Sequence, residues 1–101
     1  MIRVIASVKV KEGKLQKFLA IFNANIPSVL EEDGCIEYVP TVDVATSLDS
    51  QQVDNQLVTI IEKWESVEAL EAHLKAPHMV EYVNAVSDIV EDVALKVLQD
   101  A

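Results

Sequence analysis

The sequence of 101 residues has little cysteine, few basic residues and few aromatic ones. Cys35 is the single cysteine, so no disulfide can form within the chain, and a lone thiol suits a reducing cytosol. Eight Lys and Arg stand against 17 Asp and Glu, and the net charge of −9 disfavours binding to nucleic acid or to an anionic membrane surface. No apolar run approaches the roughly 18 residues of a membrane span. We therefore expect a cytoplasmic protein without membrane insertion.

The core must be mainly aliphatic. Half of the residues are hydrophobic, yet only 5% are aromatic. A chain of this length is expected to form one domain, over residues 1–101, with a modest core. A small domain this apolar often buries part of its surface against a second copy of itself.

The hydrophobic pattern changes period several times along the chain. Alternation of apolar residues predicts strands, and recurrence at three- and four-residue steps predicts helices. Expected in order are a strand over 2–10, a helix from Glu12 to Gly34, a strand over 35–44, a polar loop over 45–55, a strand over 56–65, two short helices started by Ser66 and Pro77, and a strand over 93–98. Pro40 cannot donate to a strand ladder, so the second strand should lie at an edge or carry a bulge.

This order, β-α-β-β-α-β with the second helical segment broken in two, predicts an α+β fold of the ferredoxin-like kind, with helices on one face of an antiparallel sheet. The third strand has apolar residues on both faces, in VTII over 58–61. Because the helices cover only one face, the other needs a second cover. We expect a homodimer in which two sheets pack face to face.

The rarest residues gather in one stretch, WESVEALEAHLKAPHMVEY over 64–82, which holds the only tryptophan and both histidines. From residue type and position, the candidate site residues are His78, His73, Trp64, Tyr38, Tyr82 and Glu62. Trp64 shares a strand face with Glu62, Tyr38 should share one with Ile36, and Tyr82 follows His78 by one helical turn.

Each candidate also has a purely structural interpretation. Trp64 could be a core anchor whose indole donates to a backbone carbonyl, and His73 a partly buried helix residue. His78 could cap a helix start, and the tyrosines could lie at a sheet edge or dimer seam. The acidic run over 31–33 is typical of a solvated helix end. Two histidines five residues apart on different helices are a poor zinc signal, so we expect no metal.

Four motifs resemble the antibiotic biosynthesis monooxygenase family of dimeric α+β barrels: GC-x-x-Y at 34–38, WES at 64–66, L-x-AHL at 70–74 and PHM at 77–79. The long polar loop, together with GC-x-x-Y-x-P-x-VD, is most similar to a bacterial quinol monooxygenase branch of that family. The resemblance implies a pocket between the sheet and the helices of each protomer. It also implies oxidation of a reduced naphthoquinone by molecular oxygen without metal, flavin or haem, and a functional link to a quinone reductase.

Haem degradation is disfavoured, because haem-degrading relatives place an asparagine on the first strand and MIRVIASVKV has none. Two other possibilities stay open: a non-catalytic carrier of small aromatic molecules or quinones, and another reaction on this fold, such as isomerisation of a small metabolite. An enzyme should present a histidine to the bound ring, whereas a carrier needs only apolar walls. We expect His78 or His73 to act as the base, with Trp64, Tyr38, Tyr82 and Glu62 binding substrate.

Overall fold

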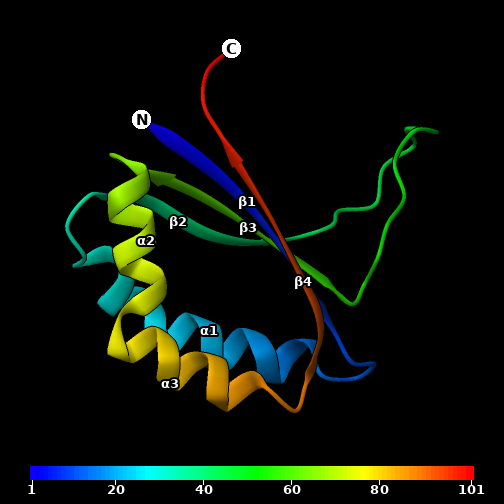
Figure 1. Ribbon diagram of the computed structural model, residues 1–101. Helices are drawn as coiled ribbons and strands as arrows, with labels where there is room; N and C mark the ends of the chain where they lie inside the picture. The colour runs from blue at the N-terminus through cyan, green and yellow to red at the C-terminus, as the bar shows by residue number, and fades with distance from the viewer.

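The computed structural model describes all 101 residues and has the element order β-α-β-β-α-α-β (Figure 1). The elements are β1 (Ile2–Val10), α1 (Leu15–Leu30), β2 (Cys35–Val42), β3 (Leu57–Trp64), α2 (Val67–Lys75), α3 (Pro77–Val86) and β4 (Val90–Leu98). The four strands form one antiparallel sheet in the order β2-β3-β1-β4. The three helices lie on the same side of this sheet (Figure 1). The predicted ferredoxin-like α+β fold is confirmed.

Local sequence signals set the helix starts as expected. The Ser66 side chain accepts a hydrogen bond from the Ala69 N–H at 3.1 Å and so caps α2. Pro77 occupies the first turn of α3, where its missing N–H costs nothing. The largest errors in the predicted strand limits concern β2 and β4. β2 ends at Val42 and not at Val44, and β4 begins at Val90 and not at Val93. β4 starts early because Val90 already pairs with Val10, and a register shift leaves Glu91 as an extra residue before Asp92 pairs with Lys9.

β2 is the other edge of the sheet, as Pro40 predicted, because it pairs only with β3. Its register shifts between Cys35 and Glu37, which leaves Ile36 as an extra, unpaired residue. Ile36 is 44% exposed, so the expectation that it shares the packed face of Tyr38 was wrong. Beyond the bulge the register places Tyr38 opposite Glu62, and the two therefore lie on the same face.

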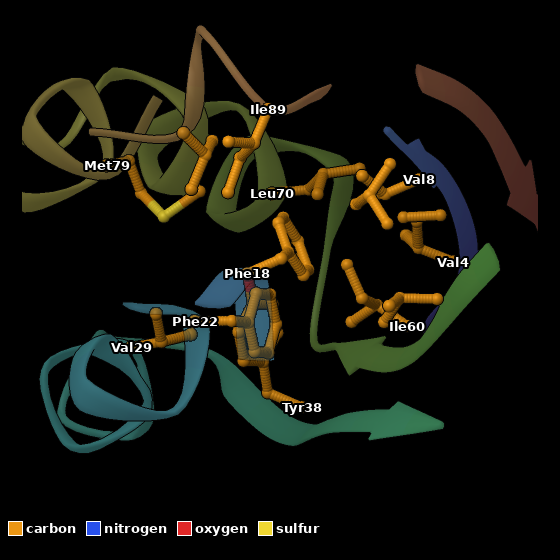
Figure 2. Packing of buried hydrophobic residues seen from close by; sticks show 14 of the residues in the cluster. Val4, Val8, Phe18, Phe22, Val29, Tyr38, Ile60, Leu70, Met79 and Ile89 are labelled. Atoms are coloured by element: carbon orange, nitrogen blue, oxygen red, sulfur yellow. The ribbon is translucent and has the colours of Figure 1, made fainter. Parts of the chain in front are cut away.

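The core lies between the sheet and the helices. Alternate residues of the two central strands are buried there: Val4, Ala6, Val8, Val10, Val58, Ile60, Glu62 and Trp64. Phe18 and Phe22 of α1 complete it, with ring centroids 5.9 Å apart, and Phe22 stacks on Tyr38 at 5.2 Å. Figure 2 shows these three rings gathered between the strands and the helices. This aromatic column packs α1 against β2.

The helices leave the β4 edge of the sheet uncovered. Val93 and Leu95 pair with Val8 and Ala6, so they lie on the helix side of the sheet, yet each is at least half exposed. On α3, the apolar side chains of Val80 and Val83 are 52% and 55% exposed. An apolar opening therefore separates α3 from β4.

The segment between β2 and β3 projects away from the body of the protein (Figure 1). It is nevertheless held at its base, where the Asp54 N–H donates to Asp43 Oδ2 at 2.9 Å and Lys9 pairs with the Asp54 carboxylate. The predicted polar loop over 45–55 lies within this segment.

Candidate active site

A cavity of about 210 Å³ lies between the sheet and the helices, beside the opening at β4. Most of its walls are apolar, and it is lined by Ala6, Val8, Tyr38, Ile60, Glu62, His73, Leu74, Met79, Tyr82, Val83, Val86, Val90, Val93 and Leu95. Four of the six predicted site residues are in this lining: Tyr38, Glu62, His73 and Tyr82. An apolar cavity with a few convergent polar groups is typical of a small-molecule site.

Glu62 is a buried acid in the cavity wall. The alternation of β3 places it on the same face as Trp64, whose indole Nε1 donates to Glu62 Oε1 at 2.9 Å. Burial raises the pKa of Glu62 to about 7; the indole hydrogen bond works against this rise, and the charge of Glu32 adds to it. Near neutral pH the cavity therefore contains a carboxyl group that is protonated part of the time.

Trp64 itself lies behind the cavity wall. It is fully buried, and its ring centroid is 4.6 Å from that of His73. The core-anchor interpretation of Trp64 is correct, but the indole partner is the Glu62 carboxyl and not a backbone carbonyl. Trp64 thus positions two lining residues, Glu62 and His73, and does not line the cavity itself.

His73 of α2 is 2% exposed and presents one edge to a carboxylate. Its Nδ1 lies 2.7 Å from Glu32 Oε2. Burial lowers the pKa of His73, and the contact with Glu32 offsets part of that change. The neutral ring then donates from Nδ1 to Glu32, which leaves the lone pair on Nε2. An imidazole oriented in this way by a carboxylate is the arrangement of a general base.

Glu32 is the site residue that sequence reasoning missed. The acidic run was expected to be solvated, and Glu31 and Asp33 are exposed, but the Glu32 side chain is only 17% exposed. Gly34, with φ at +83°, turns the chain directly after this run, and its Cα lies so close to α2 that an added Cβ would stand 2.7 Å from the Ala69 Cβ. In the sequence, only the glycine of this turn hinted that Glu32 differs from its solvated neighbours. Its partner, His73, could not be foreseen because it lies 41 residues further along the chain.

His78 lies outside the cavity lining, at a shallow surface groove between α1 and α3. Its Nδ1 is 3.1 Å from Asn25 Oδ1, and its Nε2 is 3.5 Å from Glu32 Oε2. Glu32 therefore stands between the two histidines. Of the two bases that the sequence left open, His73 is the one that lines the cavity.

The two tyrosines supply hydroxyl groups to the cavity. Burial is the largest cause that raises the pKa of Tyr38, and likewise that of Tyr82, with the charge of Glu62 adding to both. Both hydroxyls therefore remain protonated in the neutral range and can act as donors. Tyr82 is held in place by edge contacts with Phe18 and Phe22.

No three of the His, Cys, Asp and Glu side chains are grouped to hold a metal ion. No helix combines the length and the apolar character that crossing a membrane requires.

Comparisons with known proteins agree with this architecture. The antibiotic biosynthesis monooxygenase family matches residues 1–85. The probable quinol monooxygenase YgiN of Escherichia coli K12 is 39% identical over 101 residues, which cover 98% of this chain and 97% of that protein. A solved structure from Shewanella oneidensis is 28% identical, with a TM-score of 0.80, over 96% of this chain and 87% of the other. Another, from Mycobacterium tuberculosis, is 25% identical, with a TM-score of 0.82, over 99% of this chain and 94% of the other. The chain belongs to the antibiotic biosynthesis monooxygenase family.

Proposed function

We propose that this protein is a quinol monooxygenase that needs no cofactor and oxidises a reduced naphthoquinone with molecular oxygen. The observation that carries the proposal is a histidine beside a carboxylate in an apolar cavity: His73, oriented by Glu32, lines a space of about 210 Å³. This volume lies below the roughly 300–1,000 Å³ of sites for drug-sized ligands, which favours a substrate of about two fused rings. The similarity to a probable quinol monooxygenase supports the same class of substrate.

The main chemical task of the protein in this reaction is to ionise the substrate. The reactive form of a hydroquinone is its anion, and a phenol has a pKa of about 10, by analogy with tyrosine. Bringing that pKa to about 7 requires roughly 4 kcal/mol of preferential stabilisation of the anion. His73 Nε2 removes the proton, and the hydroxyls of Tyr38 and Tyr82 are neutral donors to the phenolate. The substrate itself supplies the electrons.

Glu62 fits this scheme in its protonated form. A carboxylate in the wall would repel the phenolate, whereas a neutral carboxylic acid can donate a hydrogen bond to it. A pKa of about 7 makes the neutral form available at physiological pH. The carrier alternative, by contrast, needs only apolar walls and gives no role to His73 or Glu62.

The test is oxidation of chemically reduced menadione, followed by oxygen uptake and by quinone absorbance. We expect oxidation well above the spontaneous rate and no change after EDTA treatment, with heat-denatured protein as the control. Saturable binding without acceleration would contradict the proposal and support the carrier. Absence of both would mean that this substrate class is wrong.

We also propose that a second copy of the chain covers the outer face of the sheet. Ile5, Ile61 and Val39 pair across β1, β3 and β2, so they form an apolar row on the face away from the helices. A row of this kind is expected to be covered by another apolar surface. Sedimentation should give twice the chain mass of 11.2 kDa, and Ile61→Asp should give a monomer. Val80→Asp, on the exposed side of α3, is the matched control; a wild-type monomer would contradict the proposal.

A further inference from the structure

Behind His73 the polar contacts continue to the surface of the protein. Glu32 Oε2 lies 2.7 Å from His73 Nδ1 and 3.5 Å from His78 Nε2, and His78 Nδ1 lies 3.1 Å from Asn25 Oδ1. These two imidazoles are the nitrogen-bearing side chains within 4 Å of the Glu32 carboxylate. These contacts form a row of polar groups that runs from the cavity, through the Glu32 carboxylate, to the His78 ring at the groove between α1 and α3.

The hydrogen bonds of His78 fix where its proton is. The amide nitrogen of Asn25 is directed at Met79 Sδ, at 3.4 Å, so its oxygen faces His78 and must accept from Nδ1–H. In the neutral ring, His78 Nε2 then carries the lone pair. This atom is buried and makes no hydrogen bond, and it faces a carboxylate oxygen, which is also an acceptor. Two acceptors that face each other leave room for one proton between them.

We propose that Glu32 and His78 hold the proton of the substrate during turnover, as a reservoir behind His73. This role rests on the proposed function. In the first step the substrate O–H bond breaks and an N–H bond forms at His73 Nε2. The His73 Nδ1–H bond breaks as the proton passes to Glu32 Oε2 and on to His78 Nε2. The substrate becomes an anion and the Glu32–His78 pair gains the positive charge, so the total charge of the site is unchanged.

The same path returns the proton. In a monooxygenation one oxygen atom of O₂ enters the product and the other leaves as water, which needs two hydrogens from the quinol. The stored proton moves back from His78 through Glu32 to His73 Nδ1, and His73 gives its Nε2 proton to the oxygen that leaves. The second hydrogen of this water comes directly from the oxidised substrate. His73 returns to its starting tautomer. Atoms and electrons balance with O₂ and the quinol alone.

No other cation competes for Glu32. The charge of Glu32 acts on Cys35, Tyr38 and Glu62 from the sheet side, and Glu81 and Tyr82 of α3 line the groove beside His78. All are neutral or acidic, so a proton is the one positive charge that can settle on the Glu32–His78 pair.

The test replaces His78 by alanine, since the groove gives small molecules access to the space that this ring occupies. We expect kcat to fall roughly 10²-fold with KM little changed, which is the lower end of the effect of removing one proton-transfer group. Added imidazole should restore the rate, and substituted imidazoles should do so in order of their basicity. Glu81→Ala, in the same groove, is the control and should neither lose activity nor respond to imidazole. An unchanged kcat in His78→Ala, or a loss that no imidazole restores, would overturn the proposal.

A measurement without substrate separates this role from the proposed activity. Because both imidazoles contact one carboxylate oxygen, His73→Gln should shift the ¹⁵N resonances of the His78 ring, and this effect should be absent when Glu32 is also replaced by glutamine. No effect of His73→Gln on the His78 ring would overturn the sharing of a proton. Wild-type protein that fails to oxidise any quinol would instead overturn the proposed activity, and the NMR result would stand by itself.

Discussion

Replacing His73 by glutamine should lower kcat for quinol oxidation by roughly 10²–10⁴-fold and change KM little, because general-base catalysis contributes about this much. The variant keeps an amide that can donate to Glu32 Oε2, the partner of His73 Nδ1 at 2.7 Å. It therefore removes the base and preserves the hydrogen bond that ties α2 to the end of α1. Steady-state oxygen uptake across quinol concentrations measures both constants.

The matched control for His73→Gln is Glu71→Gln, an exposed position on the same helix. It should leave both constants unchanged. Thermal unfolding of both variants checks that the fold survives, because His73 is almost fully buried. A folded His73→Gln variant that retains full kcat would exclude His73 as the base.

Replacing Glu62 by glutamine should stabilise the protein by about 3 kcal/mol at pH 8 and by almost nothing at pH 4.5 or below. In the unfolded chain the Glu62 carboxyl ionises at its ordinary pKa of 4.5, whereas in the folded protein the pKa is about 7. Between these values the folded state keeps a proton that the unfolded state has released, so stability falls as pH rises. The full difference, at about 1.4 kcal/mol per pKa unit, is reached above pH 7. Glutamine does not ionise, and its carbonyl oxygen can still accept from the Trp64 indole.

Urea denaturation at a series of pH values from 4.5 to 8 measures this effect. His73 contributes with the opposite sign, since its lowered pKa makes stability fall as pH decreases below its ordinary value of 6.5. That contribution is common to wild type and variant, so the difference between the two curves isolates Glu62. Glu71→Gln should follow the wild-type curve. Parallel curves for wild type and Glu62→Gln would mean that Glu62 is ionised in the fold.

Local patterns in the sequence were enough to place the framework of the site. The alternation of β3 put Glu62 and Trp64 on one face, and Ser66 and Pro77 marked the starts of the two helices that carry His73 and His78. The indole donor of Trp64 was recognised, but its partner was not. A strand periodicity says which face a side chain occupies and nothing about the group it meets there.

The remaining features depend on contacts between distant parts of the chain. Glu32 belongs to an acidic run whose neighbours, Glu31 and Asp33, are solvated, and only the turn at Gly34 distinguishes its surroundings. The two histidines were equivalent by residue type. Their difference comes from the tertiary placement of α2 and α3, which brings His73 to the cavity and His78 to the groove between α1 and α3. The exposure of Val83 likewise follows from the helices stopping short of β4.

The shared carboxylate of Glu32 has a consequence for how the chain folds. Glu32 follows the last turn of α1, and its carboxylate contacts His73 of α2 and His78 of α3. Such contacts, made across 41 residues in the case of His73, require that large loops have already closed, so they form late in folding. In a nascent or partly unfolded chain, in which α2 and α3 have not docked, His73 lacks the carboxylate that orients it. Activity in this protein is therefore tied to completion of the tertiary structure, and local opening of α2 should abolish it before the sheet is disturbed.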